Sequence, residues 1–222
     1  MHPDAERSRP DDIRLVVRIW LPDRPGALGL VASRIGAIGA DIVGIDVLER
    51  SEHVAVDEFA IVLGRGDLVN LLVREIEEVD GVSVEEWRLV DRFPDPRLDA
   101  LETVEALAQA TERGDLAVAL ANDVRAEFQA DWSAVLCEGR ALATIGTGAP
   151  APSVLEALAA GTSASAAVAA GDAGPDDLAV APLDKWDAVL FVGRDGRAFR
   201  RRERRQLLAL GRIADRIASL LP

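Results

Sequence analysis

The sequence predicts an α+β protein made of two domains. A strand pattern with a period of two over residues 13–20 leads directly into an amphipathic helix pattern. The second half begins with two helix patterns and then changes to the period of strands. Between the halves, Pro94 and Pro96 stand two residues apart, which predicts a short, stiff linker over residues 93–97. A chain of 222 residues, 49% of them hydrophobic, is long enough for two cores of ordinary size.

A turn at residues 21–29 joins the first strand to the first helix. The strand alternates Ile13, Leu15, Val17 and Ile19 with other residues, and the helix repeats Leu28, Val31, Ile35 and Ile38 at spacings of three and four. Pro25 suits the first helical position, and Gly26 and Ala27 leave the helix N-terminus uncrowded. First-turn N–H groups have no partner inside a helix and lie at the positive end of its dipole. The turn is therefore predicted to bind a small anion such as a carboxylate.

The residues of this turn, Asp23-Arg24-Pro25-Gly26-Ala27-Leu28, resemble the loop motif of the ACT domain, a small regulatory module. The resemblance covers residues 11–92. Residues 41–47, 54–63 and 82–90 are similar to the second, third and fourth strands of the family, and residues 67–79 to its second helix. The resemblance implies the order βαββαβ, a ferredoxin-like antiparallel sheet and side-by-side pairing of two modules. It also implies binding of a free amino acid or similar small effector at their junction.

The motif suggests how an effector would be held. The N–H groups of Gly26, Ala27 and Leu28 would donate hydrogen bonds to its carboxylate, and Arg24 is a second candidate for that carboxylate. Asp23 would shape the turn through its side chain. The resemblance implies that the effector's amino group and side chain meet the second strand of a partner subunit. The expected binding residues are Asp23, Arg24, Pro25, Gly26, Ala27, Leu28, Ile42 and Val43. The alternative is that Pro25-Gly26 only starts a helix and the pocket is vestigial.

The second half alternates helix and strand patterns. Helix patterns cover residues 101–108, 116–128 and 207–220, and strand patterns cover residues 132–137, 140–144, 178–183 and 186–192. Gly114-Asp115 is expected to break the chain between the first two helices, and Glu138-Gly139 to form the turn of the first hairpin. Ser153 is expected to cap a short helix that ends at Leu158. The alanine-rich residues 157–170 give no interpretable pattern.

The last third resembles the C-terminal signature of a GAF domain, a sensory module with a central antiparallel sheet flanked by helices. The resemblance is carried by Val180-Ala181-Pro182-Leu183, Ala188-Val189-Leu190-Phe191-Val192, Ala198-Phe199-Arg200 and residues 203–217. It implies a GAF-like domain over residues 98–222. The segment before Leu178 is short and made of Ala, Gly, Ser and Thr, unlike the longer loops and helices of ligand-holding members. Dimerisation or signal transmission is therefore the expected role of this half.

Composition excludes several classes of partner. A net charge of −13 argues against nucleic acid, because phosphate contacts require a basic surface. The basic run at residues 200–205 is interpreted as a solvated or partner-facing helix surface, with intersubunit salt bridges and polyanion binding as alternatives. No apolar run approaches the roughly 20 residues that span a bilayer, and no membrane partner is expected. The polar residues 1–10 read as a disordered tail without a signal peptide, so the protein is expected in the cytoplasm.

Few residues are suited to catalysis. Cys137 is the only cysteine, which excludes an internal disulfide, and no cofactor or metal is expected. Carboxylate pairs such as Asp57-Glu58 and Glu77-Glu78 are expected to face water. The predicted function is that of a non-catalytic sensor: a homodimer that binds an amino acid and acts on a partner enzyme or signalling protein. A purely structural assembly module and an enzyme with an unrecognised site are the alternatives.

Overall fold

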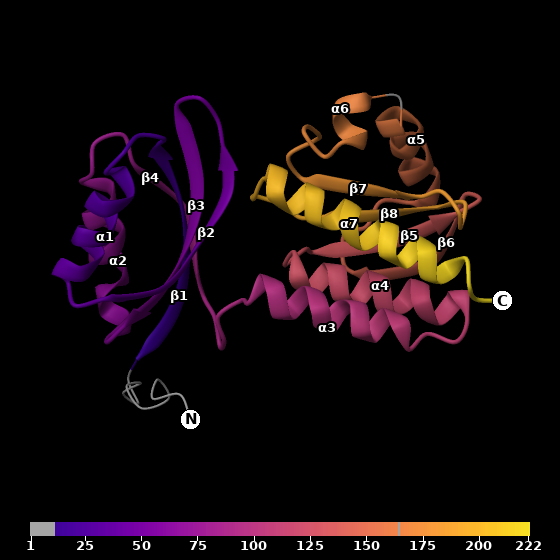
Figure 1. Cartoon of the computed structure of the whole chain (residues 1–222), viewed down its shortest axis with the longest axis horizontal. Coiled ribbons are helices and arrows are strands. Elements are labelled where there is room, and N and C mark those ends of the chain that lie inside the picture. Colours follow the sequence, from indigo (N-terminus) through magenta and orange to yellow (C-terminus); the bar gives the residue numbers. More distant parts are fainter. Residues whose placement is uncertain (1–11, 164) are drawn as a thin grey trace. The chain divides into compact units, whose positions relative to one another are not determined.

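The computed structural model describes residues 12–163 and 165–222, and the chain divides into two units, Met1–Pro94 and Asp95–Pro222 (Figure 1). Each unit has its own four-stranded antiparallel sheet with helices packed on it, which confirms the α+β class. The predicted tail, residues 1–10, lies outside the described residues. Across the described part of the chain, every helix is too short or too polar to cross a membrane.

The first unit has the element order βαββαβ. Its elements are β1 (Ile13–Pro22), α1 (Ala27–Ala37), β2 (Asp41–Arg50), β3 (Val54–Leu63), the 3₁₀ turn η2 (Gly66–Leu68), α2 (Val69–Glu77) and β4 (Ser83–Leu89). The sheet order is β2-β3-β1-β4, and each neighbouring pair is antiparallel. The strands β2 and β4 therefore form the two edges of the sheet.

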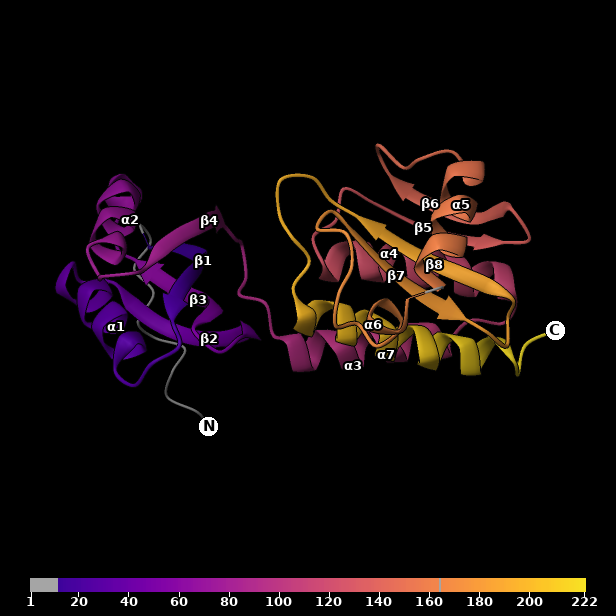
Figure 2. The ribbon, with the colours of Figure 1, turned by 90° about the horizontal axis from the view of Figure 1, so that it is seen from above.

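The core of the first unit lies between the sheet and its two helices, which cover the same face (Figure 2). The period of two along β1 places Leu15, Val17 and Ile19 on that face, where each is fully buried. The helices contribute residues spaced by three and four, including Val31 and Ile35 of α1, because this spacing makes one apolar stripe.

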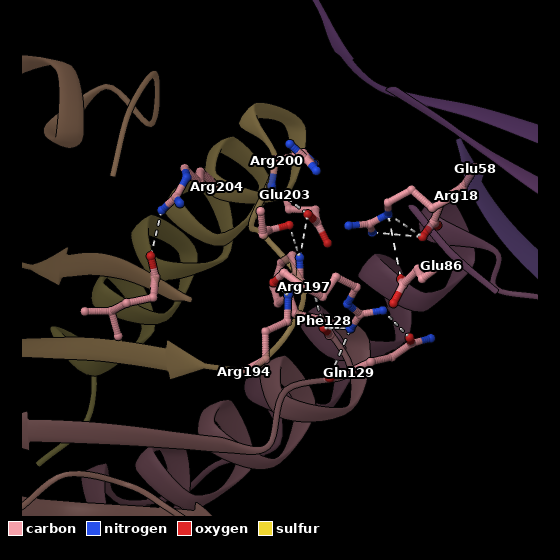
Figure 3. Close-up of polar contacts among 12 residues, drawn as sticks. Arg18, Glu58, Glu86, Phe128, Gln129, Arg194, Arg197, Arg200, Glu203 and Arg204 are labelled. Carbon is pink, nitrogen blue, oxygen red and sulfur yellow. Dashed lines mark hydrogen bonds and ion pairs between the residues drawn. The ribbon is translucent and has the colours of Figure 1, made fainter. Parts of the chain in front are cut away.

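The opposite face of this sheet carries a charged cluster (Figure 3). Arg18 of β1 is 1% exposed and lies opposite Glu58 of β3 and Glu86 of β4 in the strand register. Its Nη2 atom is 2.8 Å from the Glu58 carboxylate, and Arg88 Nη1 is 3.3 Å from the same oxygen. These ion pairs allow a buried arginine on a sheet face. The expectation that Asp57-Glu58 faces water is wrong, because adjacent strand residues point to opposite faces, and here Asp57 is buried while Glu58 is partly buried in the ion pair with Arg18.

The second unit has two helical layers around its sheet. Its elements are α3 (Pro96–Ala108), α4 (Arg113–Glu127), β5 (Trp132–Cys137), β6 (Arg140–Gly146), α5 (Pro152–Ser163), α6 (Ala166–Ala169), β7 (Leu178–Leu183), β8 (Ala188–Gly193) and α7 (Arg201–Ala218). The sheet order is β6-β5-β8-β7, all antiparallel. The larger core joins this sheet to α4 and α7, and a smaller one joins its other face to α5.

Two helix boundaries of the second unit differ from prediction. Helix α3 begins at Pro96, inside the residues expected to form a linker, because proline is accepted at the first helical position. The side chain of Asp95 caps this helix and accepts hydrogen bonds from the amides of Arg97 and Leu98 at 3.1 Å. Gly114 does not break the chain but lies in the first turn of α4.

The alanine-rich segment is also more helical than predicted. Helix α5 starts at Pro152 and runs to Ser163, so Ser153 lies inside the helix and does not cap it. The short helix α6 follows, and the Ser165 side chain accepts a hydrogen bond from the Val168 amide at 3.4 Å. Alanine favours helices without giving an amphipathic pattern, which is why periodicity missed this part of the chain.

Arginines at the start of α7 tie the segment before β7 to the helix, and the solvated interpretation of residues 200–205 is wrong for the buried Arg200 and Arg204. Arg204 is 8% exposed and donates hydrogen bonds to the carbonyls of Leu178, at 2.7 Å, and Pro175. Arg201 Nε and Arg205 Nη2 donate to one oxygen of Asp172 at 2.8 and 2.9 Å. These side chains therefore have a structural role within the second unit.

Candidate functional site

The turn between β1 and α1 is held by backbone hydrogen bonds, one of them to the loop before β3. The Asp23 amide donates to the His53 carbonyl at 3.0 Å, and the Arg24 amide to the Pro22 carbonyl at 2.9 Å. Helix α1 starts at Ala27 with Gly26 as its N-cap, so Pro25 lies before the helix and not at its first position as predicted. Gly26 has a φ of 88°, in the left-handed region that glycine adopts without strain. This conformation turns the chain sharply into the helix.

Two of the three predicted amide donors are unused. The Ala27 amide donates to the Arg24 carbonyl at 3.3 Å and is occupied by the turn itself. The amides of Gly26 and Leu28 make no hydrogen bond within residues 12–163 and 165–222. Both lie at the positive end of the α1 dipole, where an anion is favoured. The nearby Arg24 is exposed, so its guanidinium adds a cation to the same turn.

An ion pair fixes the turn to the far end of β2. Arg50 donates from Nη2 to Asp23 Oδ1 at 2.6 Å and from Nε to Asp23 Oδ2 at 3.2 Å. This two-point contact engages both carboxylate oxygens of Asp23 and links the turn to β2. Sequence reasoning missed Arg50, because only the pairing of β2 with β3 brings it to the turn.

Asp57 is a second residue that sequence reasoning missed. It is 4% exposed, and its Oδ1 atom has no hydrogen-bond partner in the described structure. It lies opposite Ile19 of β1 and Val47 of β2, on the sheet face that carries the helices. Burial raises the pKa of the Asp57 carboxyl, the positive charge of Arg50 opposes this change, and the negative charge of Asp23 adds to it.

The two residues predicted on the second strand lie far from the turn of the same copy. Ile42 pairs with Ile61 and is thereby level with Leu15, seven residues before Pro22 on β1. At the rise of an antiparallel strand this separation is roughly 24 Å. Ile42 packs against the core, whereas Val43 is 51% exposed next to a register shift of β2. One copy therefore brings together residues 23–28 but not Ile42 and Val43.

The edge strand β2 has an apolar exposed surface. Among the described strands, β2 pairs with β3 alone and is an edge of the sheet. Along it, Val43, Ile45 and Val47 are 51%, 40% and 44% exposed. A row of exposed β-branched residues on an edge strand is typical of a surface that packs against another protein.

The second unit contains a cavity of about 400 Å³ at one end of its sheet. Apolar lining comes from Trp132, Leu158 and Leu178, and acidic lining from the exposed Asp131, Asp177 and Asp195. Arg194 also borders the cavity, but its guanidinium is buried elsewhere and donates to the carbonyl of Phe128 and the carboxylate of Glu203, both at 2.8 Å (Figure 3). The lining of this cavity is therefore acidic. Among the described residues, no group of three or more His, Cys, Asp or Glu side chains could hold a metal ion.

Comparison with known proteins gives two partial structural likenesses. The ACT domain of the GTP pyrophosphokinase of Chlorobium tepidum, solved by NMR, matches 38% of this chain and 93% of its own length, with 16% identity and a TM-score of 0.31. A protein of unknown function from Galdieria sulphuraria matches 39% of this chain and 54% of its own length, with 22% identity and a TM-score of 0.31. No family model matches the sequence. No curated protein matches it either.

Proposed function

We propose that the first unit is a non-catalytic receptor for a free amino acid or a similar small effector, bound at the turn between β1 and α1. The observation that carries this proposal is the pair of unused amides of Gly26 and Leu28 at the start of α1. A carboxylate there would accept two charge-assisted hydrogen bonds, each worth about 1.5–3 kcal/mol. The loop motif and the strand order β2-β3-β1-β4 support the assignment to an ACT-like, ferredoxin-like module.

The proposed site is completed by a second copy of the chain. Ile42 and Val43 lie roughly 24 Å from the turn of their own copy, so they reach an effector only from a partner. The exposed apolar side chains of β2, an edge strand among the described strands, favour side-by-side pairing of two sheets. In such a homodimer, β2 of one copy would lie beside the β1–α1 turn of the other and close the site.

The second unit is proposed to be GAF-like and to dimerise or to transmit the signal. Its antiparallel sheet between two helical layers supports this assignment. Side chains that would make a nucleophile with its base do not come together in the sites described above, which supports a regulatory role. We expect a cytoplasmic protein whose effector state is read by a partner enzyme or signalling protein.

The test is a calorimetric titration of the purified chain with each of the twenty L-amino acids. The variant Leu28→Pro removes one proposed donor, and proline is tolerated in the first turn of a helix. Its control, Leu28→Ala, keeps the amide and truncates a side chain that is 40% exposed. We expect Leu28→Pro to weaken binding by about 10-fold or more and Leu28→Ala to leave it nearly unchanged. Equal affinities of the two variants would refute the amide site.

A structural assembly module is the second candidate, and the exposed apolar edge of β2 favours it. In this case the pocket is vestigial, and titration with each of the twenty amino acids gives no heat of binding. The protein would still be a dimer by sedimentation velocity, and Val43→Glu would place a charge on the edge and give monomers. An amino acid that binds and also strengthens the dimer would favour the receptor over this candidate.

A further inference from the structure

One carboxylate oxygen beside the candidate site is buried without a partner. Asp57 is 4% exposed and its Oδ1 atom accepts no hydrogen bond from the described residues. A buried carboxylate without a partner lowers stability, because it has lost water and gained no replacement. Nearly all buried polar atoms in proteins are paired, so this one requires an explanation. A ligand that donates to Oδ1 would supply the missing partner.

The strand register directs Asp57 to the same side of the sheet as the turn. Asp57 pairs with Ile19 of β1, and Ile19 belongs to the core beneath the helices. Two residues earlier on β3, Ala55 pairs with both Leu21 and Arg50. Because residues two apart on a strand share a face, Asp57 and Arg50 lie on the helix-covered face. From that face Arg50 reaches Asp23 in the turn at 2.6 Å.

The charges around this corner are arranged in two groups. The unused amides of Gly26 and Leu28, with the α1 dipole behind them, favour an anion. Arg50 is already held by both oxygens of Asp23, so it leaves Asp57 without a direct ion pair. Ala55, the cross-strand partner of Arg50, precedes Asp57 by two residues on β3 and shares its face. A buried carboxylate oxygen without a hydrogen-bond partner therefore lies on the sheet face that leads to the turn, whose two amides are unused.

We propose that Asp57 is the specificity residue that binds the ammonium group of a zwitterionic effector, in the same copy whose Gly26 and Leu28 amides bind its carboxylate. This inference rests on the proposed function and adds one point to it. One subunit then binds both charged groups of the effector. The β2 strand of the partner subunit contacts the effector's side chain with apolar residues and covers the site. A ligand without the ammonium group leaves the buried carboxylate unpaired and is disfavoured for that reason.

The experiment uses the amino acid that binds tightest in the titration of the full chain, together with its desamino acid, which keeps only the carboxylate. The wild-type protein is expected to prefer the amino acid by about 10-fold or more. Asp57→Asn is nearly isosteric and removes the charge, so it is expected to abolish this preference while the desamino acid binds as before. The control Asp41→Asn changes an exposed aspartate at the other end of β2 and should keep the preference.

Stability gives a second readout that a purely structural role of Asp57 would not produce. Without a ligand, Asp57→Asn is expected to raise the melting temperature, because an unpaired buried charge disappears. A lower melting temperature together with an unchanged preference would overturn the proposal. Equal affinity of the wild-type protein for the amino acid and its desamino acid would overturn it without any variant. If none of the twenty amino acids binds, the proposed function itself fails; if one binds and Asp57→Asn still discriminates, only this inference fails.

Discussion

Glu127 at the C-terminal end of α4 gives the clearest test of how burial controls the stability of the second unit. Its Oε1 atom accepts a hydrogen bond from the Gln206 amide on α7, and its Oε2 atom has no partner in the described structure. Burial raises the pKa of this carboxyl from 4.5 to about 7, and the negative charges of Asp99 and Asp123 add to the effect. The hydrogen bond from Gln206 acts in the opposite direction.

The sign of the pH dependence follows from this raised pKa. The folded protein holds the Glu127 proton more tightly than the unfolded chain, so this stabilisation is fully present below pH 4.5 and is lost as pH rises through about 7. A shift of this size would correspond to about 3.4 kcal/mol for a fully buried group. Because Glu127 is only partly buried, solvent screening reduces the expected effect to about 1–2 kcal/mol.

The variant Glu127→Gln isolates this contribution, because the amide keeps an acceptor for Gln206 and never ionises. We expect its free energy of unfolding in urea to exceed that of the wild type by about 1–2 kcal/mol at about pH 8, and the difference to shrink toward about pH 5. The control Glu105→Gln alters an exposed glutamate of α3 and should change little at either pH. A difference that is independent of pH, or a loss of stability at about pH 8, would refute this reasoning.

Two further substitutions test the packing and the hydrogen bonding of the second unit, and both are measured by urea denaturation. Gly193→Ala would place a Cβ 2.2 Å from Trp132 Cε2, so we expect the free energy of unfolding to fall by about 3 kcal/mol or more. A decrease below about 1 kcal/mol would mean that the indole moves aside freely. Asp215→Ala removes the carboxylate oxygen that accepts hydrogen bonds from the amides of Lys185 and Trp186 at 2.9 and 3.0 Å. We expect the free energy of unfolding to fall by about 2–4 kcal/mol. Asp215→Asn keeps an acceptor, and an equal loss in both variants would contradict a role for these hydrogen bonds.

Sequence predicted the local parts of the fold well, because local physics determines them. The alternation along β1 requires no information from elsewhere in the chain, and the hairpin turn Glu138-Gly139 adopts the positive φ values, 47° and 70°, that such a turn needs. The linker predicted at Pro96 is wrong, because proline disrupts the interior of a helix but is accepted at its first position. The choice between the two depends on the cap at Asp95, which a composition argument does not weigh.

The candidate site likewise has a part that the sequence predicts and a part that only the fold brings together. The turn from Asp23 to Leu28 is contiguous, so its motif could be recognised, although the bond from the Ala27 amide to Arg24 removed one expected donor. Arg50 and Asp57 are distant in sequence from the turn and approach it only through the register of three strands. The sequence pattern predicts a solvated Asp57-Glu58 pair, because burial of a single charged residue in a strand leaves no periodic signal.

The unsatisfied polar groups of the first unit explain why a zwitterion is the ligand expected at this corner. The two free amides can be solvated at the start of α1, so they cost little when no ligand is present. The buried Asp57 carboxylate lowers the stability of the unliganded protein more than the amides do. A lone cation would pair with this carboxylate but would make no hydrogen bond with the amides. A lone anion would use the amides and leave Asp57 unpaired. Only a molecule with both charges would satisfy both groups, and the conformation of Gly26 together with the Asp23–Arg50 pair would place the amides for it.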